Sequence, residues 1–198
     1  MNISPSQQKA IIRLITASNW QQRIVALVIV MVGAWACVNQ ETPQGQPGQL
    51  SANSQISGEV VGVADGDTIT LLDAGKKQYK LRLAYIDAPE KAMPFGQVAK
   101  QSLSDLVYRQ TVTARIDDVD RYGRGVARIS KNGQDINLQQ VSTGMAWHYT
   151  QYAKKTQSRS DFAAYQQAEL QARDGKIGLW QDENPTPPWD WRKAKRGQ

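Results

Sequence analysis

The sequence has little of the chemistry on which many sites depend: among 198 residues there is one cysteine, Cys37, and one histidine, His148. A single cysteine excludes an internal disulfide, although it neither requires nor forbids an oxidising compartment. No partner residues are arranged around His148 that would support a catalytic role. We therefore expect His148 to be an exposed loop residue.

The chain also lacks a uniform excess of positive charge, although its net charge is +6. Residues 1–38 hold three cations and no acid, and the tail from Trp189 holds four cations and one acid, so residues 39–188 are formally neutral. Net charge alone therefore does not indicate nucleic-acid binding, and the basic tail is interpreted as a solvated end.

The longest apolar run, Ile24–Val38, is preceded by Lys9, Arg13 and Arg23. A run of about 15 residues is short for a membrane span but typical of a signal peptide. Residues 1–38 are therefore predicted to direct export, leaving the protein secreted, periplasmic or tethered to the outer face of a membrane. Cleavage near Ala34, lipidation of Cys37 and retention as an anchor remain open, and a buried core helix is the alternative.

Composition divides the remainder into three parts. Residues 39–55 are rich in Gln, Gly and Pro without periodicity, which predicts a flexible linker. Residues 56–180 are expected to form the folded domain. Residues 181–198 form a basic tail that contains Trp and Pro and is expected to pack across the surface through its tryptophans.

Two short stretches, 64–68 and 81–90, concentrate acids that would repel one another unless a cation lies among them or some become protonated. Their carboxylates belong to Asp65, Asp67, Asp87 and Glu90, and Arg82 is the nearby cation. The stretches contain neither cysteine nor histidine, so all candidate ligands are oxygen atoms. Such a set favours a hard ion, Ca²⁺ or Mg²⁺, and indicates a metal-dependent site for a phosphate ester.

Strand patterns recur around these stretches. Strands are predicted at 56–64, 68–72, 79–86, 111–116 and 126–129, with turns at 74–77 and 132–133. In the third strand Tyr79, Leu81, Leu83 and Tyr85 are expected to share one face, which places Arg82 on the other. Helical spacing predicts helices at about 95–108, near 138–144 and at 158–174, the last capped by Ser158 and ended by Gly175. These elements predict an α+β fold, a five-stranded β-barrel of the oligonucleotide-binding (OB) type with about three helices.

With these motifs placed, the chain resembles the staphylococcal nuclease-like (thermonuclease) family over roughly residues 56–180. The resemblance rests on residues 65–68, on Arg82 with residues 87–90, on 120–124 and on 144–147, in this order and spacing. It implies a five-stranded barrel capped by helices and Ca²⁺-dependent hydrolysis of phosphodiester bonds in DNA and RNA, which leaves 3′-phosphorylated products.

The resemblance also implies roles for individual residues. Ca²⁺ would be held by Asp67, Asp87 and the backbone carbonyl of Ala88, where the family often has Thr, with Asp65 nearby. Glu90 would orient or deprotonate the attacking water, and Arg82 and Arg124 would clamp the phosphate. The residues expected to contact substrate are Arg121, Tyr122, Tyr149 and Tyr152.

Three functions follow as alternatives. The leading hypothesis is an exported, monomeric Ca²⁺-dependent nuclease. A noncatalytic barrel that binds nucleic acid or protein is the second, and loss of Arg82, Glu90 or Arg124 would be its signature, but all three are present. A phosphodiesterase for another ester, such as a nucleotide at the cell envelope, is the third.

Overall fold

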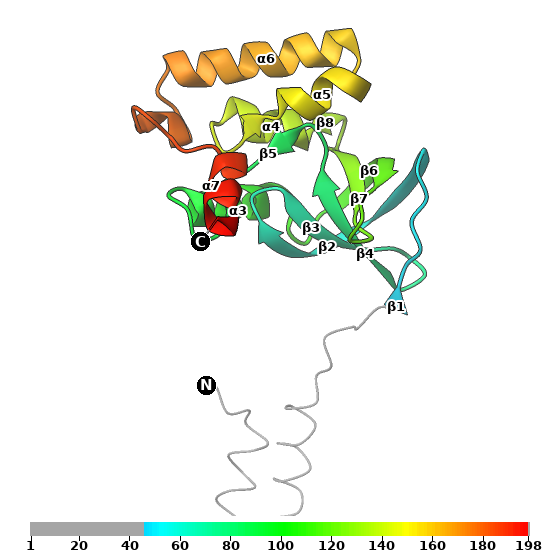
Figure 1. Cartoon of the computed structure of the whole chain (residues 1–198). Helices are drawn as coiled ribbons and strands as arrows, with labels where there is room; N and C mark the ends of the chain where they lie inside the picture. Colours follow the sequence, from blue (N-terminus) through cyan, green and yellow to red (C-terminus); the bar gives the residue numbers. More distant parts are fainter. Residues whose placement is uncertain (1–45, 198) are drawn as a thin grey trace, which may run out of the picture. The chain divides into compact units, whose positions relative to one another are not determined.

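The computed structural model describes residues 46–197, and one compact unit spans Gly45–Gln198 (Figure 1). The predicted export segment, with its cleavage, lipidation and retention alternatives, and residues 39–45 of the predicted linker lie outside the described residues. Between residues 46 and 197, no helix combines the length and the apolar character needed to cross a membrane.

The centre of the described unit is a closed five-stranded barrel. Its strands are β2 (Ser54–Asp65), β3 (Thr68–Leu72), β4 (Lys77–Leu83), β6 (Thr111–Val119) and β7 (Gly125–Lys131). They pair in the order β4-β3-β2-β6-β7, and a parallel pairing of β4 with β7 closes the sheet on itself. The predicted OB-type barrel is therefore confirmed.

Four two-residue strands extend this framework. They are β1 (Gln46–Pro47), β5 (Ile86–Asp87), β8 (Gln134–Asp135) and β9 (Trp147–His148). β1 pairs in parallel with β4, so the described end of the predicted linker contacts the barrel. β5 pairs with β9, which brings Asp87 opposite Trp147.

Alternation along the strands fills the barrel as the sequence pattern predicts. In β4 the side chains of Tyr79, Leu81 and Leu83 are buried in the main core, and Arg82 lies on the outer face, partly exposed. The core also includes Val60, Ile69, Leu71, Val112, Ile116 and Ile129 from the other strands. The inward-facing side chains therefore form the core, and outward-facing residues such as Arg82 are not needed to fill it.

Within residues 46–197, five helices accompany the barrel, and Figure 1 shows where they lie. They are α3 (Gly96–Val107), α4 (Ile136–Ser142), α5 (Thr150–Thr156), α6 (Arg159–Asp174) and α7 (Pro188–Arg196), with a 3₁₀ turn η1 at Gly178–Gln181. α3, α4 and α6 match the three predicted helices, and Ser158 caps α6 by accepting a hydrogen bond from the Asp161 N–H. α5 and α7 are helices that the sequence patterns did not predict.

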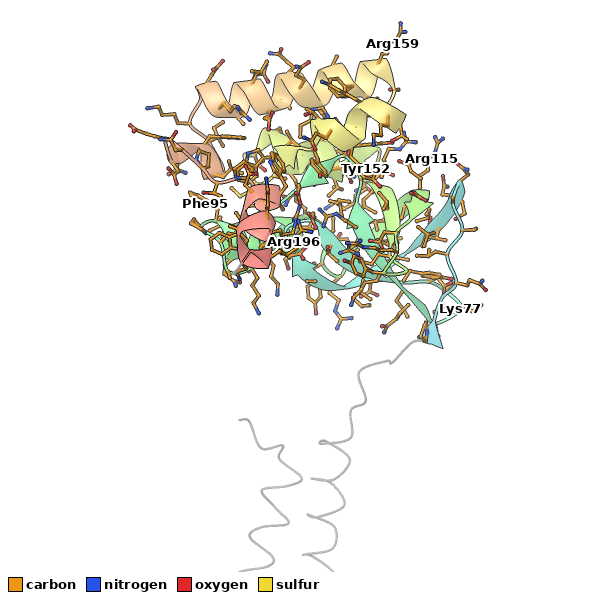
Figure 2. The ribbon with its side chains drawn as sticks, viewed as in Figure 1. Lys77, Phe95, Arg115, Tyr152, Arg159 and Arg196 are labelled. Carbon is orange, nitrogen blue, oxygen red and sulfur yellow. The ribbon has the colours of Figure 1, made fainter. Side chains whose placement is uncertain are left out.

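A second apolar cluster lies where the C-terminal segment meets the domain. Trp147, Ala172, Leu179 and Trp180 are buried together, and Phe95 and Trp189 pack against them. Trp147 and Trp180 meet edge to face with 5.4 Å between ring centroids. This cluster fixes the start of α7 beside the start of α3, and Figure 2 shows Phe95 and Arg196 on this side of the barrel.

The prediction for His148 was wrong, because its side chain is only 2% exposed. Its ring lies against Phe162 and Tyr165 of α6, and Nε2 is 3.0 Å from Oε1 of Gln157. Burial lowers the pKa of His148, which favours the neutral imidazole. The sequence around His148 gave no sign that α6 would cover it.

Candidate active site

The turn between β2 and β3 carries the first two acids, Asp65 and Asp67. Between them, Gly66 faces Ala88 and Ala99 so closely that an added Cβ would lie 2.7 Å from the Cβ atom of each. The buried amide of Gln140 donates to the carbonyl of Gly66 at 2.9 Å. Only glycine allows this approach, so the turn is fixed against α3 and α4 and both carboxylates have defined positions.

The end of β4 brings in the third acid. Tyr85 adopts a left-handed backbone conformation, with φ of 67°, which redirects the chain after Leu83. Its hydroxyl donates to Asp117 at 2.8 Å, and its carbonyl accepts from the Tyr149 N–H. Asp87 follows two residues later with a fully buried side chain. The chain thus places a carboxylate beneath the outer face of the barrel, beside Asp67.

Arg82 connects the two buried acids. Its Nη1 donates to Oδ1 of Asp67 at 3.2 Å, while Nη2 lies 3.1 Å from Oδ2 of Asp67 and donates to Oδ1 of Asp87 at 2.6 Å. The charge of Asp67, followed by that of Asp87, raises the pKa of Arg82. One guanidinium therefore fixes the spacing of two carboxylates that come from different elements.

Two of the acids have displaced pKa values. Burial and the neighbouring charge of Asp67 raise the pKa of Asp65 to about 6. Burial also raises the pKa of Asp87, although hydrogen bonds from Arg192 and the charge of Arg82 oppose the shift. Both carboxyl groups therefore hold a proton more readily than exposed acids do, and a cation bound beside them would oppose this shift.

The oxygen atoms around Asp67 suit a hard cation. The backbone N–H of Ala88 donates to Oδ2 of Asp67 at 3.1 Å, and the Thr68 hydroxyl donates to Oδ1 at 2.9 Å. Asp67 thus contacts the backbone of Ala88, the residue that follows Asp87, and the predicted ligands of the ion are all oxygen atoms. Within residues 46–197, no group of three or more His, Cys, Asp or Glu side chains is arranged to hold a metal ion.

Glu90 joins the other acids through a residue that the sequence patterns did not indicate. Nη1 of Arg192, on α7, donates to Oε1 of Glu90 at 2.7 Å and to Oδ1 of Asp87 at 3.1 Å. Its Nη2 donates to Oδ2 of Asp87 at 2.5 Å. Burial alone would lower the pKa of Arg192, but the hydrogen bonds to Asp87 and Glu90 raise it overall.

The loop 120–124 lies at the edge of this region. The register pairs Gly125 with Leu81 and Val126 with Arg82, so the loop joins β7 beside the strand that carries Arg82. The Arg124 guanidinium, however, pairs with Asp120 at 2.8 Å and not with the acids. Asp120 also accepts backbone N–H bonds from Tyr122 and Arg124, so it holds the loop in shape.

Two segments, the loop 120–124 and residues 149–152, carry the aromatic rings that are predicted to contact substrate. Tyr122 is 69% exposed, and the guanidiniums of Arg121 and Arg124 lie over its ring at 4.9 and 5.5 Å from the centroid. Tyr149 stacks between Tyr152 and Trp189, with centroid distances of 6.0 and 5.3 Å. Of these rings, Tyr122 and Tyr152 are exposed to solvent, where a nucleic-acid base could reach them.

The fold and this site define a class: a closed OB-type barrel with helices and, on its outer face, acids held together by arginines. The chain matches the family model described as staphylococcal nuclease homologue over residues 80–182. It is 46% identical over 137 residues to an "Uncharacterized endonuclease" of Haemophilus influenzae. The aligned region covers 69% of this chain and 73% of that protein.

Two further relatives extend the comparison. The chain is 41% identical over 156 residues to the micrococcal nuclease of Shigella flexneri, covering 74% of this chain and 86% of that protein. It is 42% identical over 120 residues to a "Probable staphylococcal-like nuclease" of Oryza sativa, of which it spans only 34%. This chain belongs to the staphylococcal nuclease homologue family.

Proposed function

We propose that this protein hydrolyses phosphodiester bonds in DNA, RNA or both, and that it depends on Ca²⁺. The observation that carries the proposal is the contact of one guanidinium, that of Arg82, with both Asp67 and Asp87. Such a group holds carboxylate oxygens from two chain segments at a fixed spacing, with a guanidinium beside them that can pair with a phosphate. The names of the relatives, endonuclease and micrococcal nuclease, support the same reaction class.

Each residue has a distinct part in the proposed reaction. Glu90, whose side chain is 38% exposed, accepts the proton of the attacking water at the solvent side of the acids. Arg82 and Arg124 donate paired hydrogen bonds to phosphate oxygens, where negative charge increases as phosphorus becomes five-coordinate. For this contact, Arg124 exchanges its pairing with Asp120 for the phosphate, and Arg82 exchanges part of its pairing with Asp67 and Asp87.

Asp67, Asp87 and the carbonyl of Ala88 would hold the ion, and Asp65 would add negative charge beside them. When bound, the ion would neutralise the phosphate oxygens and assist formation of the nucleophile. Tyr122 and Tyr152, both exposed, would stack on bases without selecting among them, with Arg121 beside Tyr122 and Tyr149 beneath Tyr152.

Digestion of supercoiled plasmid and of RNA tests the proposal, with Ca²⁺ in one series and a chelator in the other. We expect cleavage of at least one polymer with Ca²⁺ and none with chelator. Binding without cleavage would favour a noncatalytic module. Hydrolysis of a small phosphodiester in the absence of polymer cleavage would favour the envelope phosphodiesterase.

We also propose that the protein acts outside the cytoplasm as a monomer, exported by residues 1–38. Mass spectrometry of the protein isolated from its own cells tests this proposal. A mass that lacks the first 34–36 residues supports cleavage near Ala34, and a lipid adduct on Cys37 supports tethering. The full-length mass in the soluble cytosolic fraction would contradict export.

A further inference from the structure

Arg192 differs from the other cations of the C-terminal segment. Lys193, Lys195 and Arg196 are exposed, and Lys195 lies over the ring of Trp191 at 5.2 Å. Arg192, by contrast, is 34% exposed at its side chain and contacts two acids of the candidate site. In the described part of the tail, the acids are thus reached by one specific guanidinium and not by diffuse positive charge.

The geometry of Arg192 is that of a bridge. One nitrogen, Nη1, donates both to Oδ1 of Asp87 and to Oε1 of Glu90. Asp87 is fully buried, whereas the side chain of Glu90 is 38% exposed. Without the bridge, the two negative charges would repel and the partly exposed Glu90 side chain could rotate into solvent. The guanidinium therefore fixes the direction of the Glu90 carboxylate relative to the buried acid.

The helix that carries Arg192 is anchored in the apolar cluster. Pro188 is buried, and Trp189 stacks on Tyr149 and meets Trp147 edge to face at 6.3 Å. Trp189 and Arg192 are three residues apart, so they lie on the same face of α7. Packing of Trp189 therefore fixes α7 in the orientation in which Arg192 contacts the acids. This is expected of a helix that belongs to the folded domain and not of a loosely attached tail.

The charge of the group allows Arg192 to stay when a divalent ion is present. Asp65, Asp67, Asp87 and Glu90 carry four negative charges when ionised, and Arg82 and Arg192 carry two positive charges, which leaves a deficit that one divalent cation would balance. A carboxylate offers about four acceptor positions. The hydrogen bonds that Asp87 accepts from Arg82 and Arg192 use three of these acceptor positions, which leaves about one for an ion.

From these observations we infer that Arg192 is a positioning residue of the nuclease site, which holds Glu90 in the direction from which it accepts a proton from water. The inference rests on the proposed function, because it assigns Arg192 a role through Glu90. It adds the C-terminal helix α7 to the site, because Arg192 on this helix orients the carboxylate of Glu90.

Steady-state cleavage by Arg192→Ala, with Arg192→Lys and Lys193→Ala beside it, gives the first test. We expect kcat of Arg192→Ala to fall about 10- to 100-fold, as for other residues that orient a reacting group, with KM nearly unchanged. Arg192→Lys should recover part of the loss. Lys193→Ala removes the same charge from the same helix without touching Glu90, and should match the wild type.

A double-mutant cycle with Glu90→Gln separates positioning from general stability. If Arg192 acts through Glu90, Arg192→Ala should add little further loss of activity in the Glu90→Gln background. The same cycle, measured as unfolding free energy in chelator, needs neither metal nor turnover. There we expect the losses to be non-additive, because Arg192→Ala removes, and Glu90→Gln weakens, the same ion pair.

Opposite results would overturn the inference. Faster cleavage or tighter Ca²⁺ binding by Arg192→Ala would show that α7 obstructs the site, and kinetics equal to those of Lys193→Ala would show that Arg192 positions nothing. Failure of the wild type to cleave would instead refute the proposed function. In that case the double-mutant cycle in chelator would still test the contact between Arg192 and Glu90. Additive losses of unfolding free energy would contradict the contact, and non-additive losses would support it.

Discussion

The backbone N–H of Ala88 donates a hydrogen bond to Oδ2 of Asp67 at 3.1 Å. This bond connects the β2–β3 turn to the segment that follows β5, across 21 positions of the chain. It holds Asp67 beside the segment that carries Asp87. The precision of the site therefore depends on how closely these two backbone segments approach each other.

Gly66→Ala tests this dependence. Its new methyl group would lie 2.7 Å from the Cβ atoms of Ala88 and Ala99, so one of the segments must move. We expect a loss of about 1–3 kcal/mol in unfolding free energy, as for other overpacked sites, together with weaker Ca²⁺ binding. Denaturant unfolding and calorimetric titration measure the two effects.

Gly62→Ala is the matched control, because its methyl group would meet Thr70 at an ordinary 3.5 Å. It should leave both quantities near the wild-type values. If Gly66→Ala binds Ca²⁺ as well as Gly62→Ala does, the close approach at Gly66 does not determine the metal site.

Arg82→Met should destabilise the metal-free protein and make it more dependent on Ca²⁺. Removing this guanidinium leaves two buried carboxylates with one fewer cation, a change that costs about 3 kcal/mol in comparable pairs. Because an added ion would then replace the lost charge, Ca²⁺ should raise the melting temperature of Arg82→Met more than that of the wild type.

Arg109→Met provides the comparison, since Arg109 is 61% exposed and pairs with an exposed Glu59. Such a surface pair contributes within about 1 kcal/mol. Equal stability of the Arg82 and Arg109 variants in chelator would contradict the role assigned to Arg82.

Local sequence patterns predicted much of the barrel and of the turn that carries Asp65 and Asp67. The alternation in β4 predicted that Arg82 would face outward, and the Asp-Gly-Asp spacing predicted a turn at Gly66. Both are local consequences of side-chain direction and turn chemistry. The barrel followed, because five such strands with a helix after the third leave few ways to bury one apolar face of each.

The contact between Arg192 and Asp87 could not be predicted in this way, because the two residues are 105 positions apart. α7 spans Pro188–Arg196, too short for an apolar repeat to emerge. One signal was present: Pro188 stands at the first position of the helix, where proline is favoured. His148 was misjudged for a related reason, since α6, which covers it, comes later in the chain.

Glu90→Gln should remove most of the activity and little of the stability. The amide keeps the size of the side chain but cannot take a proton from water, so we expect kcat to fall about 10²- to 10⁴-fold. Nucleotide binding should persist, because Arg82 and the exposed rings are unchanged. Single-turnover cleavage and binding to a labelled oligonucleotide measure the two effects.

Glu59→Gln serves as the control, because Glu59 pairs with Arg109 on an exposed part of the surface. Its cleavage rate should equal that of the wild type. Turnover by Glu90→Gln at the rate of Glu59→Gln would refute the assignment of Glu90 as the base.

His148 should make the protein less stable as the pH falls through the weakly acidic range. Burial lowers its pKa in the folded state below the ordinary value of 6.5, so between these two pKa values the unfolded chain binds more protons. Its Nδ1 is buried and has no hydrogen-bond partner among the described residues, so a proton added there would be unsatisfied. Unfolding free energy should therefore decline as the pH is lowered from about 7.5 through 6.5.

The titration of Asp65 changes the unfolding free energy in the opposite direction. Its pKa is raised to about 6, so the folded state binds more protons and becomes more stable as the pH falls. The contribution of His148 is therefore taken as the difference in slope between the wild type and His148→Gln. The chain has one histidine, so a single imidazole resonance follows its titration by NMR in untagged protein. A resonance that titrates at or above 6.5, or parallel stability curves for the two proteins, would show that burial does not hold His148 neutral.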